Sequence, residues 1–261
     1  IHDPTIFKKA AQTAWPEGGI SQSIDIAEVY FESGDAETAL DWLGKVSLDD
    51  HFQAHERDEL LLAIYRKLGR EKEAAETAWR IFRRSRHEET FEQLLEVVGS
   101  VSRQDLLDEE AKIILQSNEV DYTDAEFLIW CGKVEEAETY LLSHVSEIDG
   151  GYYGSILPLA EAMEHEERCL AATVLYRALL ESILARAISK YYGYGVRYLR
   201  KLDELAPRVR TWKKVTPHDK YFSQLVEKHK RKSSFWERYE AKGSGRGRNR
   251  RNSGMNDHDL G

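Results

Sequence analysis

The stretch YFESGDAETALDWLGKV, Tyr30 to Val46, decides the fold prediction. A glycine and an aspartate separate two segments of helical composition, and Gly34 can end the first helix at low cost because glycine accepts a positive φ. Ala39 follows Gly34 by five residues, and its small side chain lets the second helix approach the first closely. Leu43 and Val46 continue the same apolar face at helical spacing. The stretch therefore predicts two helices that fold back on each other around Gly34.

The same spacing recurs farther along the chain. IYRKLGREKEAAETAWRIF has an aromatic residue four positions before Gly69 and an alanine five positions after it, and FLIWCGKVEEAETYLLSHV repeats part of this pattern around Gly132. Gly34 and Gly69 are 35 residues apart, and the 63 residues from Gly69 to Gly132 leave room for two units, with a weaker turn at Gly99. Periods near 34 residues are typical of stacked two-helix repeats. This pattern predicts an all-α fold, a right-handed array of helical hairpins that forms an α-solenoid.

We place the predicted helical-repeat domain at residues 1–241. Its hairpins are expected at about 22–48, 55–86, 87–117, 122–148 and 152–185, followed by C-terminal helices at about 188–206 and 217–238. A weak point is expected near Gly193 and Gly195, where two glycines interrupt the helical pattern. Residues 242–261 contain almost no apolar side chain, which predicts a disordered basic tail.

Two parts of the sequence resemble known families. The tyrosine, the Gly-Asp turn and the alanine of the first unit resemble the tetratricopeptide repeat (TPR). The C-terminal part resembles an uncharacterised bacterial family of TPR-like helical-repeat proteins and is similar to the C-terminal region of bacterial SWIM zinc-finger proteins. The residues that carry this second resemblance are the stretches LYRALL, YLRKLDELAP and RKSSFW with Trp212, His218, Tyr221 and His229. The resemblance covers about residues 25–236 and implies a fold of helical repeats. The Cys-x-Cys and Cys-x-His pairs of the SWIM zinc motif are absent from the sequence, so its metal and nucleic-acid roles are assigned to no residue.

Charge is distributed unevenly along the chain. The net charge is −9, but the segment from Lys228 to Arg251 has ten Lys or Arg and two Glu, a net charge of +8. Residues 252–261 carry −2, which leaves −15 on residues 1–227. An acidic body with a basic C-terminal segment is therefore expected, and the basic segment is a candidate for contact with phosphates.

Composition also bears on the expected cellular location of the protein. Apolar stretches such as LLLAIY are far shorter than the roughly 20 residues that cross a bilayer, so no membrane partner is expected. The two cysteines, Cys131 and Cys169, are too few for a disulfide framework, which predicts a cytoplasmic location. The chain begins at Ile1 without an initiator methionine, from which we expect that it is a piece of a longer chain.

The segment YYGYGVRY, Tyr191 to Tyr198, is the strongest candidate for a binding surface. It combines tyrosines with nearby arginines and lysines, and rigid aromatic residues and arginines often anchor partners. The alternatives are burial of the tyrosines in the core and solvation of the cations. The predicted residues for binding a protein partner or nucleic acid are Tyr191, Tyr192, Tyr194, Arg197, Arg200, Lys201, Lys228, Lys230, Arg231, Lys232, Arg246, Arg248, Arg250 and Arg251.

We predict no catalytic residue, no cofactor and no metal ligand. His51 and His55 are four residues apart, and His218 precedes Asp219, but neither pair has the further ligands that metal-dependent catalysis needs. The Walker loop and the Gly-x-Ser-x-Gly elbow are both absent from the sequence.

The sequence therefore favours a non-enzymatic scaffold that binds a protein partner through stacked helical hairpins. The first alternative is an accessory nucleic-acid-binding module that uses the basic C-terminal segment. A metal-dependent hydrolase is a further alternative.

Overall fold

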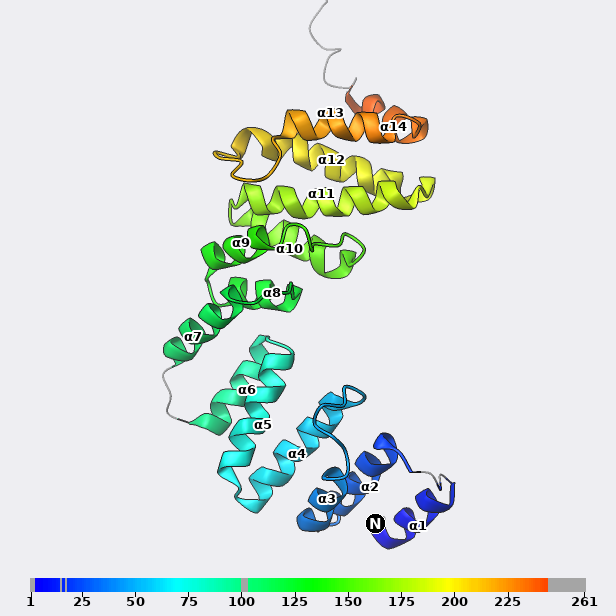
Figure 1. Ribbon diagram of the computed structural model, residues 1–261, viewed down its shortest axis with the longest axis vertical. Coiled ribbons are helices and arrows are strands. Elements are labelled where there is room, and N and C mark those ends of the chain that lie inside the picture. The colour runs from blue at the N-terminus through cyan, green and yellow to red at the C-terminus, as the bar shows by residue number, and fades with distance from the viewer. Residues whose placement is uncertain (1–2, 15, 17, 100–102, 244–261) are drawn as a thin grey trace, which may run out of the picture. The chain divides into compact units, whose positions relative to one another are not determined.

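A computed structural model describes residues 3–14, 16, 18–99 and 103–243. These residues form fourteen α-helices and two short 3₁₀ helices, with no β-strand among them (Figure 1). The predicted all-α class is confirmed for this part of the chain. The chain divides into two compact units, residues 1–112 and residues 113–261.

Unit 1 consists of helices that pack against their neighbours in the chain. Its helices are α1 (Pro4–Ala14), α2 (Ile20–Glu32), α3 (Ala36–Leu43), α4 (Ala54–Leu68), α5 (Glu71–Arg84), α6 (Glu88–Val98) and most of α7 (Arg103–Leu115). The pairs α2 with α3, α3 with α4, α4 with α5, and α5 with α6 are in contact. Buried apolar residues from α1 to α4, among them Ile26, Ala27 and Leu43, form one core cluster.

Glycines at the recurrent positions form the turns between paired helices. Gly34 lies between α2 and α3 with φ +96°, and Gly69 lies between α4 and α5 with φ +68°. Gly132, between helices of unit 2, has φ +75°. The alanines five residues after these glycines are all buried: Ala39, Ala74 and Ala137. Glycine thus provides the turn and alanine the close contact that follows it.

Two buried carboxylates bind five arginines in unit 1. Asp58, which is fully buried, accepts hydrogen bonds from Arg57 Nε at 3.1 Å and from Arg80 Nε at 3.1 Å, and also from Arg84. Arg57 is itself fully buried and donates to the carbonyl oxygens of Leu48 and Asp50, both at 3.1 Å.

Burial alone would raise the pKa of Asp58, but hydrogen bonds from Arg80, Arg57 and Arg84 outweigh this effect and leave the pKa below its ordinary value. Asp58 therefore stays ionised inside unit 1 because arginines surround it. A second buried carboxylate, Glu110, accepts from Arg83 at 2.7 Å and from Arg86 at 3.2 Å.

Unit 2 is organised around one long helix. Its helices are α8 (Tyr122–Trp130), α9 (Val134–Ser143), α10 (Tyr153–His165), α11 (Cys169–Arg186), η1 (Ser189–Tyr191), α12 (Tyr192–Leu205), η2 (Ala206–Arg208), α13 (His218–His229) and α14 (Ser233–Gly243). Of the 18 residues of α11, 12 are buried, as expected for a helix that is covered on several sides. Figure 1 shows α11 beside α10 and α12, and both helices contact it.

The break after α11 lies at Ala187, between the predicted segments 152–185 and 188–206, and not at the two glycines. Helix α11 ends at Arg186, and Ala187 has φ +56°, whereas Gly193 and Gly195 lie inside α12. A Cβ at Gly195 would be 3.1 Å from Phe235 and 3.3 Å from Ile183. Gly195 therefore allows close packing of helices, and the interruption of the helical pattern lies before the two glycines, between Arg186 and Tyr192.

The C-terminal region also has one helix more than expected. The sequence predicted a single helix at about 217–238, but α13 ends at His229 and α14 begins at Ser233. The indole N–H of Trp236 donates to the His229 carbonyl oxygen at 2.9 Å, which satisfies an acceptor that the end of α13 leaves free. Helix α14 continues to Gly243, and residues 244–261 of the predicted tail lie outside the described residues.

Gly150, just before α10, lies where the backbone passes close to that of α11. A Cβ at this position would be 2.0 Å from the carbonyl oxygen of Ala178 in α11. We expect Gly150→Ala to lower the free energy of unfolding by about 1–3 kcal/mol, because a backbone segment must move. Gly154→Ala is the matched control, since no atom lies within 4 Å of its Cβ position. Thermal unfolding followed by circular dichroism checks this, and equal melting of both variants would contradict the close approach.

Candidate partner-binding site

Helix α12 positions the predicted tyrosine and arginine segment. Its buried face contacts α11 and α14, and Tyr192, Val196 and Leu199 form a buried stripe at helical spacing. Tyr192 is only 5% exposed, and its ring packs against that of Phe235 with the centroids 5.7 Å apart. This placement removes Tyr192 from the predicted binding surface.

The two neighbouring tyrosines lie on the outside. Tyr191 is 40% exposed and Tyr194 is 50% exposed. The Arg197 guanidinium lies 5.0 Å from the centroid of the Tyr194 ring, and the Lys190 ammonium lies 5.7 Å from that of Tyr191. We call Lys190, Tyr191, Tyr194 and Arg197 the α12 surface. Cation–π contacts of this kind hold an exposed arginine in a defined place.

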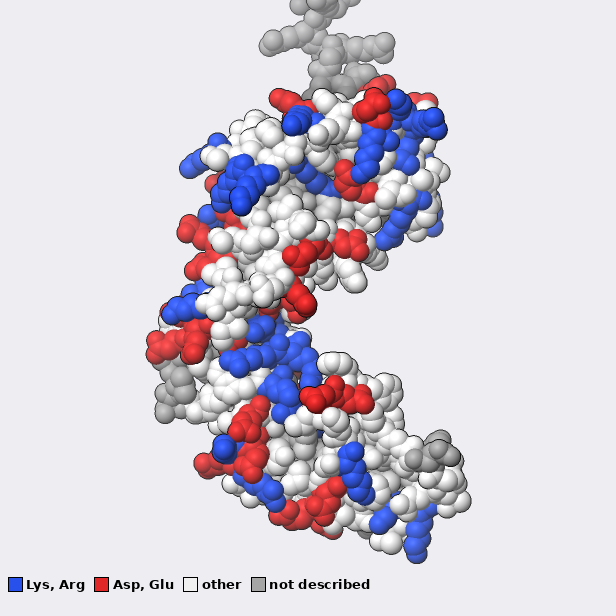
Figure 2. Space-filling view, viewed as in Figure 1, with Lys and Arg blue, Asp and Glu red and all other residues white. Residues whose placement is uncertain are grey.

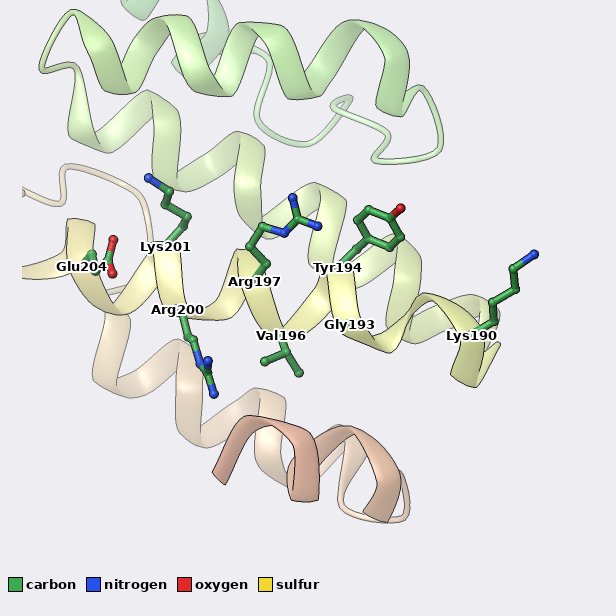
Figure 3. Close-up of a pocket in the computed structure, with 8 residues that line it drawn as sticks. All are labelled: Lys190, Gly193, Tyr194, Val196, Arg197, Arg200, Lys201 and Glu204. Carbon is green, nitrogen blue, oxygen red and sulfur yellow. The ribbon is translucent and has the colours of Figure 1, made fainter. Parts of the chain in front are cut away.

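A hollow of about 430 Å³ adjoins this surface (Figure 3). In Figure 3, Tyr194, Arg197 and Lys201 point to one side of α12, whereas Val196 and Arg200 point toward the C-terminal helices. The residues that line the hollow are Lys190, Gly193, Tyr194, Val196, Arg197, Arg200, Lys201 and Glu204. Four of the eight are cations and one is an acid, so the hollow attracts negative charge.

Two of these cations already have partners. Arg200 Nη2 donates to the Tyr239 carbonyl oxygen at 2.7 Å, and Lys201 Nζ donates to Glu164 at 2.7 Å. Burial alone would raise the pKa of Glu164, but the bonds from Lys201 and Tyr176 leave it below its ordinary value. Arg200 and Lys201 therefore stabilise the fold, whereas Lys190 and Arg197 are the lining cations that make neither an ion pair nor a side-chain hydrogen bond with any described residue.

The described part of the basic C-terminal segment is partly neutralised. Lys228 pairs with Glu181 at 2.7 Å, and Lys230 pairs with Glu227 at 2.6 Å. Arg231 is exposed and Lys232 is half-buried. Of the other predicted residues, four lie outside the described residues: Arg246, Arg248, Arg250 and Arg251. On the face shown in Figure 2, basic side chains gather in small groups with acidic side chains beside them.

None of the histidines that the sequence analysis considered as metal ligands lies in a group of ligands within the described residues. His218 Nε2 lies 3.0 Å from Asp203 Oδ1, and the Tyr239 hydroxyl donates to the other oxygen of Asp203 at 2.7 Å, so this network ties α12, α13 and α14 together. His51 precedes α4 whereas His55 lies within it. Within the described ranges, no group of three or more His, Cys, Asp or Glu side chains is arranged to hold a metal ion.

None of the helices that the structure describes combines the length and the hydropathy needed to cross a membrane.

These features define an all-helical protein of two compact units whose α12 surface combines exposed tyrosines with unpaired cations. Residues 12–238 match the model of a family of unknown function, DUF6880. The chain belongs to this family. No curated protein matches it.

Among solved structures, the chain is similar to BtubC (BKLC) from P. vanneervenii. The identity is 15%, the match covers 99% of this chain and 96% of that chain, and the TM-score is 0.31. A likeness at this level defines neither the fold nor a function. The resemblance to tetratricopeptide repeats and to SWIM proteins stays a prediction.

Proposed function

We propose that the chain is a non-enzymatic interaction protein that binds a protein partner through the α12 surface. The observation that carries the proposal is the exposed stack of Arg197 on Tyr194, which has no carboxylate partner among the described residues. Tyrosine and arginine are enriched among the residues that dominate binding energy at interfaces. Because the stack is held in place before binding, less side-chain entropy is lost when a partner docks.

The chemistry of the partner follows from the charges around the stack. Lys190 and Arg197 offer two unpaired cations, and Glu204 is the one acid that lines the hollow. An acidic segment of a protein supplies carboxylates that an arginine can bind with two hydrogen bonds, and apolar side chains that lie against the tyrosine rings. We therefore propose an acidic protein segment as the occupant.

We also propose that the helix pairs form a right-handed, TPR-like array of hairpins that presents this surface. The positive φ of Gly34, Gly69 and Gly132 and the buried alanines that follow them support this arrangement. A cytoplasmic location is proposed because Cys131 and Cys169 are free thiols, as is usual in a reducing compartment.

Nucleic acid is the second candidate partner. Arg231 and Lys232 lie near the start of the basic segment and are paired with no described carboxylate, which favours contact with phosphates there. A polyanion that used Lys228 and Lys230 as well would have to displace Glu181 and Glu227 from them. We rank this candidate second for that reason.

Affinity capture from an extract of the native cell tests the proposal. Arg197→Glu is expected to reduce capture of the partner by about tenfold or more, because it reverses the charge that meets the acidic segment. Arg210→Glu is the matched control, since Arg210 is exposed in the same unit but lies outside the hollow. Nuclease treatment should leave capture unchanged.

Equal capture by wild type and Arg197→Glu would contradict the α12 surface as the contact site. Capture that disappears after nuclease treatment, or when salt is raised from about 50 mM to about 200 mM, would instead support the nucleic-acid candidate.

A further inference from the structure

Arg177 is a buried cation in α11 whose guanidinium is held in a fixed plane. The residue is 8% exposed. Its guanidinium lies 4.0 Å from the centroid of the Tyr221 ring and 5.2 Å from that of Trp212. Nη1 donates to the Thr216 carbonyl oxygen at 2.7 Å. These contacts fix the orientation of the group, so the directions of its remaining N–H bonds are fixed as well.

Two of those N–H groups have no partner. Nε and Nη2 of Arg177 are buried and make no hydrogen bond with any described residue. They lie on one edge of the guanidinium, where parallel N–H bonds match the two oxygens of a carboxylate. Burial lowers the pKa of Arg177 to about 10, so the group still carries its charge at neutral pH. An unpaired buried charge of this kind is unfavourable and is relieved by a bound anion.

Other arginines of this chain use the same edge to bind carboxylates. Arg80 donates from Nε at 3.1 Å and from Nη2 at 3.2 Å to the two oxygens of Asp58. Arg83 and Arg86 donate from the same two nitrogens to Glu110. In Arg177 the edge has the same chemistry but makes no hydrogen bond or ion pair with a described carboxylate, although the charge of Glu181 nearby raises the pKa of Arg177 and partly offsets the effect of burial.

Arg177 lines a cavity of about 720 Å³, within the size range of sites for small molecules. Much of its lining is apolar, from Val145, Ile148, Val174, Ala178, Ala185 and Val215. Arg186 and Lys214 add positive charge, whereas the Lys228 charge is taken by Glu181 at 2.7 Å. Burial raises the pKa of the Tyr221 hydroxyl, and the nearby Glu181 carboxylate raises it further, so the hydroxyl keeps its proton and can donate.

We propose that this cavity binds a small monocarboxylate with an apolar body, whose two oxygens are held by Nε and Nη2 of Arg177. A carboxylate matches the single free edge, and the apolar lining matches the rest of the molecule. A phosphate dianion fits less well because Asp149 and Glu181 also line the cavity and repel a second negative charge. No lining residue is shared with the hollow beside α12, so this site is separate from the proposed partner surface.

Titrations of the whole chain followed by NMR test the proposal. The probes are hexanoate, benzoate and phenylacetate, the primary amide of each, and inorganic phosphate. At least one carboxylate should shift the Arg177 Nε–H signal in a saturable way with a Kd of about 1 mM or tighter, and its amide should bind about tenfold more weakly or worse.

Two variants with matched expectations complete the test. Arg177→Gln should weaken binding by about 10- to 100-fold, whereas Arg210→Gln, an exposed arginine outside the cavity, should leave it unchanged. If Arg177→Gln fails to fold, Ala185→Trp serves instead, because Ala185 is exposed and a large side chain there obstructs the cavity.

Three outcomes would overturn the proposal. The first is that none of the three carboxylates binds with a Kd below about 10 mM. The second is that the amides or phosphate bind as tightly as the carboxylates. The third is that the folded Arg177 variant, or Ala185→Trp in its place, binds as wild type does.

Discussion

Asp58→Ala is expected to lower the free energy of unfolding of unit 1 by about 3–5 kcal/mol, because it leaves Arg57 as a buried charge without a counterion. Asp58 and Arg57 are both fully buried, and Arg80 and Arg84 bind the same carboxylate from α5. Hydrogen exchange of the backbone amides of α4 and α5 measures the effect on unit 1 alone. Protection there should fall by about 100-fold or more.

Glu56→Ala provides the control for this experiment. Glu56 is exposed and lies two residues before Asp58 in the same helix, so its removal should change the free energy of unfolding by about 0.5 kcal/mol or less. Similar protection in both variants would mean that the stability of unit 1 does not require the negative charge of Asp58 beside the arginines.

The double variant Ala39→Trp with Ala74→Trp is expected to have the second largest effect. The two alanines are 0% and 3% exposed, and each follows its turn glycine by five residues. A large side chain at either place overpacks the contact and costs about 1–3 kcal/mol, so the double variant should lose about 2–6 kcal/mol if the sites are independent. Thermal unfolding followed by circular dichroism measures the loss.

The matched control is Ala10→Trp in α1. Ala10 is exposed, so the same substitution has room to project into solvent and should change the melting temperature little. An unchanged melting temperature in the double variant would show that the recurrent alanines do not lie where paired helices touch.

The turns of the fold were predictable because their determinants are close together in the sequence. Gly34 and Ala39 lie within six residues of each other, and the same short spacing located the turns at Gly69 and Gly132. A glycine that serves a distant contact leaves no such local pattern. Gly195 resembled a helix break because its contacts with Ile183 and Phe235 are made by separate helices.

The sequence located the segment that contains the candidate site, but it did not show which side chains of that segment are exposed. Tyr191, Tyr192 and Tyr194 are nearly consecutive, and only the exact start of α12 determines that the middle one is buried. Arg177 could not be singled out as a binding residue for a different reason. Its local signal was a single cation within the apolar run VLYRALL, whereas its partners Thr216, Tyr221 and Trp212 come from later segments.

Site-specific photo-crosslinking in the native cell tests the proposed binding function most directly. A photoreactive phenylalanine derivative in place of Tyr194 keeps an aromatic ring on the α12 surface, and the same replacement at Tyr153, which is 68% exposed in the same unit, is the control. The account predicts a discrete protein adduct from position 194 that is absent from position 153 and is lost when Arg197→Glu is added. Adducts to nucleic acid at position 194, or the same protein adducts from both positions, would contradict it.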